Sequence, residues 1–203
     1  MKKYHSYLKK PVWFGILLCL FFSLLHADQN REEKIKKVLS SALEQTKKTF
    51  IYDPAYEKLE YPKGDVDMWK GVCTDVVVRA FRAAGVDLQV LVHEDMTENF
   101  DVYPKIWGLS KPDKNIDHRR VPNLMTFFKR KGKDVPLSKK ATDYQPGDVV
   151  AWKLPNERLH VGIVSKKRKL LRKRHLIVHN IGWGTELEDI LFKYKIIGHY
   201  RYF

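Results

Sequence analysis

Residues 71–85 read GVCTDVVVRAFRAAG and predict an amphipathic helix that begins at a cysteine. Small and apolar residues recur at helical spacing along it, at Val76, Ala80 and Ala84. Gly85 is a typical residue for the position just after a helix, so we expect the helix to span residues 73–84. Asp75 and Arg79 are spaced for an ion pair on its surface, with the acid first as the helix dipole prefers.

The last third of the chain predicts a sheet. Apolar runs separated by turn residues lie at 149–154, 160–165, 176–181 and 196–203. Helical patterns precede them, at 31–50 and at 123–131, and the basic run 166–174 is typical of an exposed hairpin loop. Because helices come first and strands follow, the sequence indicates the α+β class, with N-terminal helices packed on a C-terminal antiparallel sheet.

The first 27 residues resemble a secretory signal. Lysines precede an apolar run from Val12 to Leu25, and Ala27 offers a small residue at the cleavage edge. We therefore expect a signal peptide at 1–27 and one domain at 28–203, in a protein that is periplasmic or secreted. An uncleaved anchor and a lipid-modified Cys19 are the alternatives.

The chain is strongly basic, with a formal charge of +14 that falls to +10 when residues 1–27 and their four lysines are removed. This favours anionic surroundings such as an envelope polymer or a lipid surface, although solubility alone also explains it. The run 166–174 lacks the aromatic residues of a single-strand nucleic-acid platform, so no nucleic-acid partner is expected. The sequence does not indicate an oligomeric state.

Cys73 is the candidate nucleophile. It is one of two cysteines, and the other, Cys19, lies in the predicted signal. A helix N-terminus and a nearby imidazolium both favour a thiolate, so we expect an ionised sulfur at this position. The plain alternative is a small core residue.

Two histidines on neighbouring predicted strands are the candidate partners of Cys73. His160 begins the run HVGIVS, and His179 lies in LIVHNI. If these strands pair antiparallel, both rings can point at one helix end, with His160 as the base and His179 as the residue that orients it. Gly162 leaves space beside His160 for a closely packed helix. Asn180 is an alternative orienting residue, although it falls on the opposite strand face.

Residues 93–123 predict a long irregular stretch that forms a cleft wall. Its polar cluster Asp117, His118, Arg119 and Arg120 is a candidate substrate-binding segment, because two arginines can hold a carboxylate; an internal salt-bridge network is the equal alternative. Metal-ligand spacings and glycine-rich phosphate loops are absent from the sequence, so no metal or cofactor is expected.

Six segments together resemble a bacterial domain family of unknown function, number 1287. They are GVCTDVVVRAFR, NIDHRRVPNL, YQPGDVVAW, HVGIVS, VHNIG and GHYRY. That family is similar in turn to the NlpC-type papain-like cysteine peptidases, which cut or modify bacterial cell-wall peptides. The resemblance covers nearly all of residues 50–203.

The resemblance implies a papain-like fold with Cys73 as nucleophile, His160 as base and His179 as third member. It also implies a tyrosine twelve residues before the nucleophile, matched by Tyr61, as a second donor to the oxyanion. The residues around the cysteine depart from the larger group, at Val72, Thr74 and Asp75.

The expected function is therefore an exported cysteine hydrolase acting on amide bonds, most simply those of peptidoglycan stem peptides. Acyl transfer from the same thiol and a non-catalytic wall-binding or lipid-binding module are the alternatives.

Overall fold

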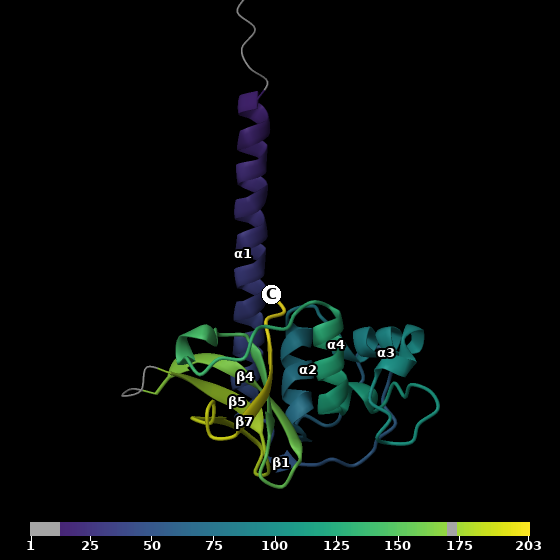
Figure 1. Ribbon diagram of the computed structural model, residues 1–203. Coiled ribbons are helices and arrows are strands. Elements are labelled where there is room, and N and C mark those ends of the chain that lie inside the picture. Colours follow the sequence, from purple (N-terminus) through teal and green to yellow (C-terminus); the bar gives the residue numbers. More distant parts are fainter. Residues whose placement is uncertain (1–12, 170–173) are drawn as a thin grey trace, which may run out of the picture. The chain divides into compact units, whose positions relative to one another are not determined.

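The computed structural model describes residues 13–169 and 174–203 (Figure 1). Internal contacts divide the chain after Glu33, and residues 34–203 form a compact body. The predicted signal, residues 1–27, lies partly outside the described residues, and its residues from Trp13 onward are helical. None of the described helices is long and apolar enough to cross a membrane. The prediction of a signal peptide stays a prediction.

The elements follow the expected order of helices first and sheet afterwards. The helices are α1 (Trp13–Gln45), α2 (Cys73–Ala83), α3 (Leu88–Glu98) and α4 (Val121–Arg130), with short 3-10 turns at Phe100–Val102, Asp117–Arg119 and Ala141–Asp143. The strands are β1 (Ile51–Tyr52), β2 (Lys70–Gly71), β3 (Val149–Lys153), β4 (Leu159–Arg168), β5 (His175–Asn180), β6 (Thr185–Glu188) and β7 (Lys195–Tyr200). The α+β class is confirmed.

Strands β3 to β7 form an antiparallel sheet in the order β6-β5-β4-β3-β7 (Figure 1). Helix α2 packs along β4 and β5, and α4 packs on β4 and β7. Strands β1 and β2 form a separate parallel pair, which leads directly into α2.

The sheet carries an apolar cluster on each face. The helix-side cluster joins α2, α3 and α4 to side chains such as Val161, Ile163 and Val178. The second cluster gathers Trp152, Val164 and other residues that alternate with the first set along their strands. This alternation decides which strand side chains face α2.

The elements differ from the sequence-based expectation at three places. Residues 93–98, expected to be irregular, belong to α3, because Asp87 caps the N-terminus of this helix and apolar residues repeat along one face. The first helix ends at Gln45, so Phe50 lies beyond it and is exposed. Strand β6 was not expected.

The basic run also differs from the expected loop. Strand β4 continues through its first residues to Arg168, and residues 170–173 lie outside the described residues.

Candidate active site

The backbone before α2 is fixed by two buried polar side chains. The Asp75 carboxylate accepts a hydrogen bond from the Val72 N–H at 2.7 Å, and the Asn180 amide donates to the Gly71 carbonyl at 3.0 Å. Gly71 has a φ of +158°, and a Cβ there would lie 3.0 Å from Asp75 Oδ2. Asn180 therefore fixes the entry to the helix from the end of β5.

Asp75 does not pair with Arg79, contrary to the sequence-based expectation. Its carboxylate binds Arg119 instead, from Nε at 2.9 Å and Nη2 at 3.0 Å. Arg79 pairs with Asp65, at 2.8 Å from Nε to Oδ2. Asp75 and Arg79 turn to different partners because each finds a buried or half-buried opposite charge across the chain.

The Cys73 side chain opens α2 and is only 4% exposed. Burial is the main cause that raises the pKa of its thiol to about 12, although the backbone N–H groups of Val161, Thr74 and Cys73 itself oppose it. The expected resting thiolate is therefore wrong, and the sulfur is protonated at neutral pH. Helix α2 packs along β4, so the Val161 N–H of that strand lies near enough to act on the thiol.

His160 and His179 meet, as antiparallel pairing of their strands predicted. His160 Nε2 lies 3.1 Å from His179 Nδ1, and the rings are arranged edge to face. Glu188 Oε2 lies 3.0 Å from His179 Nε2, without the alignment of a hydrogen bond. Burial lowers the pKa of His160 to about 3 and that of His179 to about 4, so both rings are neutral at pH 7.

Gly162 allows the two strands that carry these histidines to approach. A Cβ at this position would lie 2.7 Å from Ile177 Cγ2 and 3.0 Å from His179 Cβ. The space beside His160 is therefore filled by β5, whereas the sequence suggested a helix.

The thiol and the His160 ring reach β4 from different sides. Val161 faces α2, so alternation directs His160 toward the second cluster, where its ring lies 5.9 Å from that of Trp152. The Val161 N–H, one residue after His160, is the β4 group that acts to lower the pKa of the Cys73 thiol. No hydrogen bond joins the thiol to either ring in the described part of the chain.

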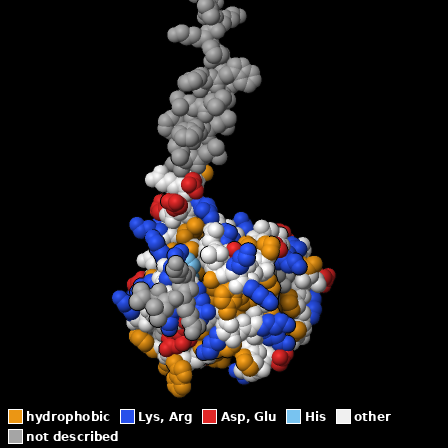
Figure 2. Space-filling model, turned by 60° about the vertical axis from the view of Figure 1, so that its left-hand side comes forward, with side chains coloured by type: hydrophobic (Ala, Val, Ile, Leu, Met, Phe, Trp, Pro, Cys, Tyr) orange, Lys and Arg blue, Asp and Glu red, His pale blue; other side chains and the backbone are white. Residues whose placement is uncertain are grey.

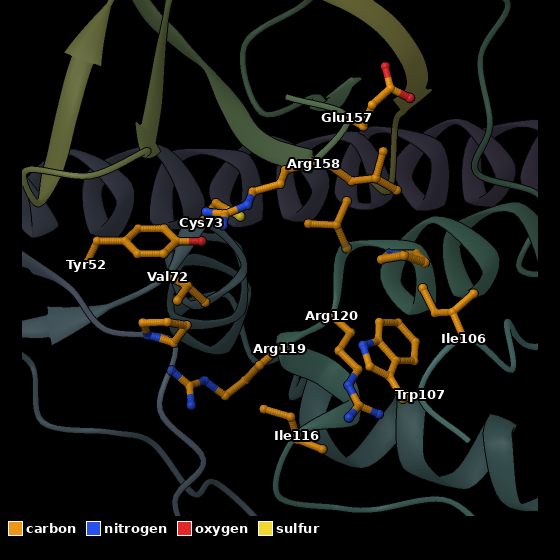
Figure 3. A pocket seen from close by; sticks show the side chains of 14 residues that line it. Tyr52, Val72, Cys73, Ile106, Trp107, Ile116, Arg119, Arg120, Glu157 and Arg158 are labelled. Carbon is orange, nitrogen blue, oxygen red and sulfur yellow. The ribbon is translucent and has the colours of Figure 1, made fainter. Parts of the chain in front are cut away.

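A pocket of about 400 Å³ opens at Cys73 (Figure 3). Tyr52, Trp107, Arg120 and Arg158 are among its lining residues. A second pocket, of about 600 Å³, is lined by His160. The two pockets share Tyr52, Arg158 and Leu159, so the thiol and the imidazole border adjoining cavities.

The segment 117–120 has a largely structural role. Asp117 and His118 are buried, and Arg119 donates to the Ala55 and Asp53 carbonyls as well as to Asp75. Burial lowers the pKa of His118 to about 4. Arg119 and Arg120 line the Cys73 pocket, whereas Asp117 and His118 do not. The segment is thus mainly the internal network that the sequence left as an alternative.

Tyr61 is not among the residues that line the pocket, which corrects its expected place beside the nucleophile. Its ring packs on His93, with centroids 5.4 Å apart, and lies under Lys114. Tyr52 is the pocket tyrosine, and its side chain is directed toward Cys73 (Figure 3). The sequence did not single out Tyr52 or Arg158, because neither lies in a segment with a recognisable motif.

The consecutive polar residues His93, Glu94 and Asp95 lie on α3. Asp95 accepts hydrogen bonds from Tyr103 at 2.6 Å, Arg130 at 2.6 Å and Lys131 at 2.7 Å. It thereby ties α3 to the end of α4. Within the described ranges, His, Cys, Asp and Glu side chains form no group of three suited to a metal ion.

Comparison with known proteins assigns the family. A model described as "Domain of unknown function (DUF1287)" matches residues 39–202. The chain is also 53% identical over 167 residues to "Uncharacterized protein YijF" of Escherichia coli (strain K12), which covers 82% of this chain and 80% of that protein. The chain therefore belongs to the DUF1287 family.

Proposed function

We propose that this member of the DUF1287 family is an exported cysteine hydrolase with a papain-like, NlpC-type catalytic arrangement. Its substrates are amides, most simply the stem peptides of peptidoglycan. The observation that carries the proposal is the contact of His160 with His179 at a pocket that adjoins the pocket of Cys73. A nucleophile, a base and a residue that orients the base are the parts that acyl transfer through a thiol requires.

The first chemical step forms a bond between Cys73 Sγ and the substrate carbonyl carbon. The thiol proton passes to Nδ1 of His160, the ring nitrogen that does not contact His179. Because the two groups meet β4 from different sides, this transfer requires the ring and the sulfur to move into reach of each other when substrate binds. The tetrahedral intermediate then collapses, the C–N bond breaks, and the leaving amine takes that proton from His160. Water attacks the thioester with His160 again as base, which releases the carboxylate and restores the thiol.

The Cys73 thiol and the His160 ring are both neutral at rest, and this constrains how the proton is transferred in the first step. The thiol pKa of about 12 and the His160 pKa of about 3 make proton transfer unfavourable before substrate arrives. Attack and proton transfer must therefore be coupled, with the oxyanion stabilised as it forms. The backbone N–H of Cys73 at the helix N-terminus and the Tyr52 hydroxyl are the donors that we assign to it.

His179 is a positioning residue in this proposal. Its Nδ1 engages His160 Nε2, which leaves the opposite nitrogen of His160 for the substrate side. Glu188 lies close enough to His179 Nε2 to stabilise the positive charge that develops during turnover.

The test is digestion of purified sacculi by the parent protein and by Cys73→Ala, with products separated by chromatography and identified by mass. We expect new peptide fragments from the parent only. His160→Gln should also abolish turnover, whereas the control His175→Gln, a buried histidine on the same strand as His179, should retain it. Equal digestion by Cys73→Ala and parent would refute the proposal.

A second candidate is a non-catalytic module that binds an anionic wall polymer or lipid. The raised thiol pKa favours it, as does the spread of Lys and Arg side chains over the surface of the body (Figure 2). Alkylation of Cys73 measured against pH separates the two candidates. A thiol that stays inert in the folded protein, together with retained sacculus binding, supports the module. Transfer to an added amine instead of water would identify an acyltransferase.

A further inference from the structure

The three arginines that line the Cys73 pocket differ in how they are engaged. Arg119 is committed to the fold, since its guanidinium binds the Asp75 carboxylate and the carbonyls of Ala55 and Asp53. Its side chain is almost fully buried. These contacts use four of its five N–H groups, so at most one donor is left for an incoming ligand.

Arg120 is also engaged. Its Nη1 lies 3.2 Å from Asp117 Oδ1, and its guanidinium lies 4.1 Å from the centre of the Trp107 ring. Figure 3 shows the Arg120 and Trp107 side chains together at one side of the pocket. Arg120 therefore builds a wall of the pocket with Trp107.

Arg158 is different. Its backbone is fixed in the turn between β3 and β4, where its carbonyl accepts from Leu154 N–H at 2.9 Å and its N–H donates to Asn156 Oδ1 at 3.2 Å. Its side chain has no ion pair or hydrogen bond within residues 13–169 and 174–203. The adjacent Glu157 pairs with Lys153, so it does not neutralise Arg158.

The Arg158 guanidinium lies toward Tyr52 and Cys73 (Figure 3). Burial and the nearby Cys73 raise the pKa of Tyr52 to about 12, and the charge of Arg158 opposes that rise. An uncommitted cation and a protonated phenol hydroxyl thus face the same part of the pocket. Both can donate a hydrogen bond, and a carboxylate offers two oxygens that accept one from each.

We propose, on the basis of the hydrolase function above, that Arg158 selects amide substrates that carry a carboxylate next to the scissile bond. The guanidinium binds the carboxylate, the Tyr52 hydroxyl donates to the carboxylate or to the carbonyl beside it, and Ile106 and Trp107 accept an apolar neighbour. Arg119 and Arg120 remain bound within the fold and form walls of the pocket, while Arg158 binds the substrate carboxylate.

The test uses the thiol itself as the reporter. Iodoacetate and iodoacetamide both form an S–C bond at Cys73 and release iodide, but only iodoacetate carries a carboxylate. The rate of each is measured by mass spectrometry on the full chain, at one pH and low salt. The ratio of the two rates reports on the charge near the sulfur, whatever the reactivity of the thiol.

We expect the parent to favour iodoacetate relative to Arg158→Gln by about fivefold, the order for one partly exposed charge pair. The preference should fall with added salt. Arg158→Lys should keep part of it. Lys139→Gln, which removes one exposed positive charge elsewhere, should leave the ratio unchanged.

The outcomes separate this proposal from the one that it rests on. A ratio that does not change in Arg158→Gln overturns carboxylate selection and leaves the hydrolase intact. A thiol that reacts with neither reagent, in a parent protein that also leaves sacculi undigested, overturns both. Arg158 is exposed, so the variant is expected to fold, and unchanged thermal unfolding checks this.

Discussion

The Asp75 carboxylate receives two N–H groups of Arg119 in the interior of the protein, at 2.9 and 3.0 Å. The same carboxylate accepts from the N–H of Val72, the residue before Cys73. The loop that carries Arg119 is thereby joined to the start of the helix that carries the thiol. The pair acts on the site through position rather than through substrate contact.

Arg119→Lys is expected to lower stability far more than Arg120→Lys. Lysine keeps the charge but cannot donate in parallel to both Asp75 oxygens or reach the two carbonyls. Removal of one partner of a buried pair costs on the order of 3–5 kcal/mol, so Arg119→Ala should approach that loss. Denaturant unfolding measures it. Equal stability of the Arg119 and Arg120 variants would contradict a structural role for Arg119.

The neutral histidines predict a loss of stability in acid. The pKa of His160 is about 3 in the folded protein, against 6.5 for an ordinary histidine. The unfolded chain therefore binds more protons between these values, and stability that is present above pH 6.5 is lost as the pH falls toward 3. His160→Gln should make this loss shallower, as measured by denaturant unfolding at several pH values. An unchanged pH dependence would show that the ring is not held neutral.

Much of the fold could be predicted from the sequence because its signals are local. The helix after Cys73 begins and ends almost where spacing and Gly85 placed it. The strands that carry His160 and His179 were found from short apolar runs, and their pairing followed from the α+β order. Helix α3 was missed because prolines farther along the chain dominated the interpretation of residues 93–123.

The site was less predictable because its partners are set by tertiary contacts. The sequence around Asp75 does not show whether its carboxylate pairs with Arg119 or with Arg79, since either arginine would neutralise its charge. Tyr52 and Arg158 reach the pocket from a two-residue strand and a turn, which carry no motif. The protonation of Cys73 depends on its burial, and burial of a helix N-terminus cannot be deduced from spacing.

The buried thiol predicts a loss of stability in alkali. Its pKa is about 12 when folded, against 9.0 for an ordinary cysteine. The folded protein therefore holds a proton that the unfolded chain releases between these values. Stability is complete below pH 9 and falls as the pH rises toward 12.

Cys73→Ala should lessen that alkaline loss. Thermal unfolding of parent and variant is measured at pH values from neutral to about 10. The quantity compared is the change of stability with pH, not the stability at any one pH. The result that contradicts this account is a parent whose stability between these limits runs parallel to that of the variant. Such a parent would hold Cys73 as a thiolate already.

Gly162→Ala tests whether close approach of β4 and β5 sets the geometry of the two histidines. The new methyl group would lie 2.9 Å from the Val178 carbonyl oxygen and 3.0 Å from His179 Cβ, and a strand backbone cannot yield as a side-chain tip can. Overpacking of this kind costs about 1–3 kcal/mol. Gly182→Ala is the matched control, because a Cβ there has nothing within 4 Å.

The two effects of Gly162→Ala can be measured separately. Denaturant unfolding gives the stability, and NMR of the imidazole nitrogens gives the contact between His160 and His179. We expect the variant to lose stability and to change both ring signals, while Gly182→Ala changes neither. Gly162→Ala could lose stability but keep the ring signals of the parent. In that case β4 and β5 move apart away from the histidines, and the His160–His179 contact does not depend on this glycine. A stable variant with unchanged rings would mean that the sheet at Gly162 has room for a methyl group.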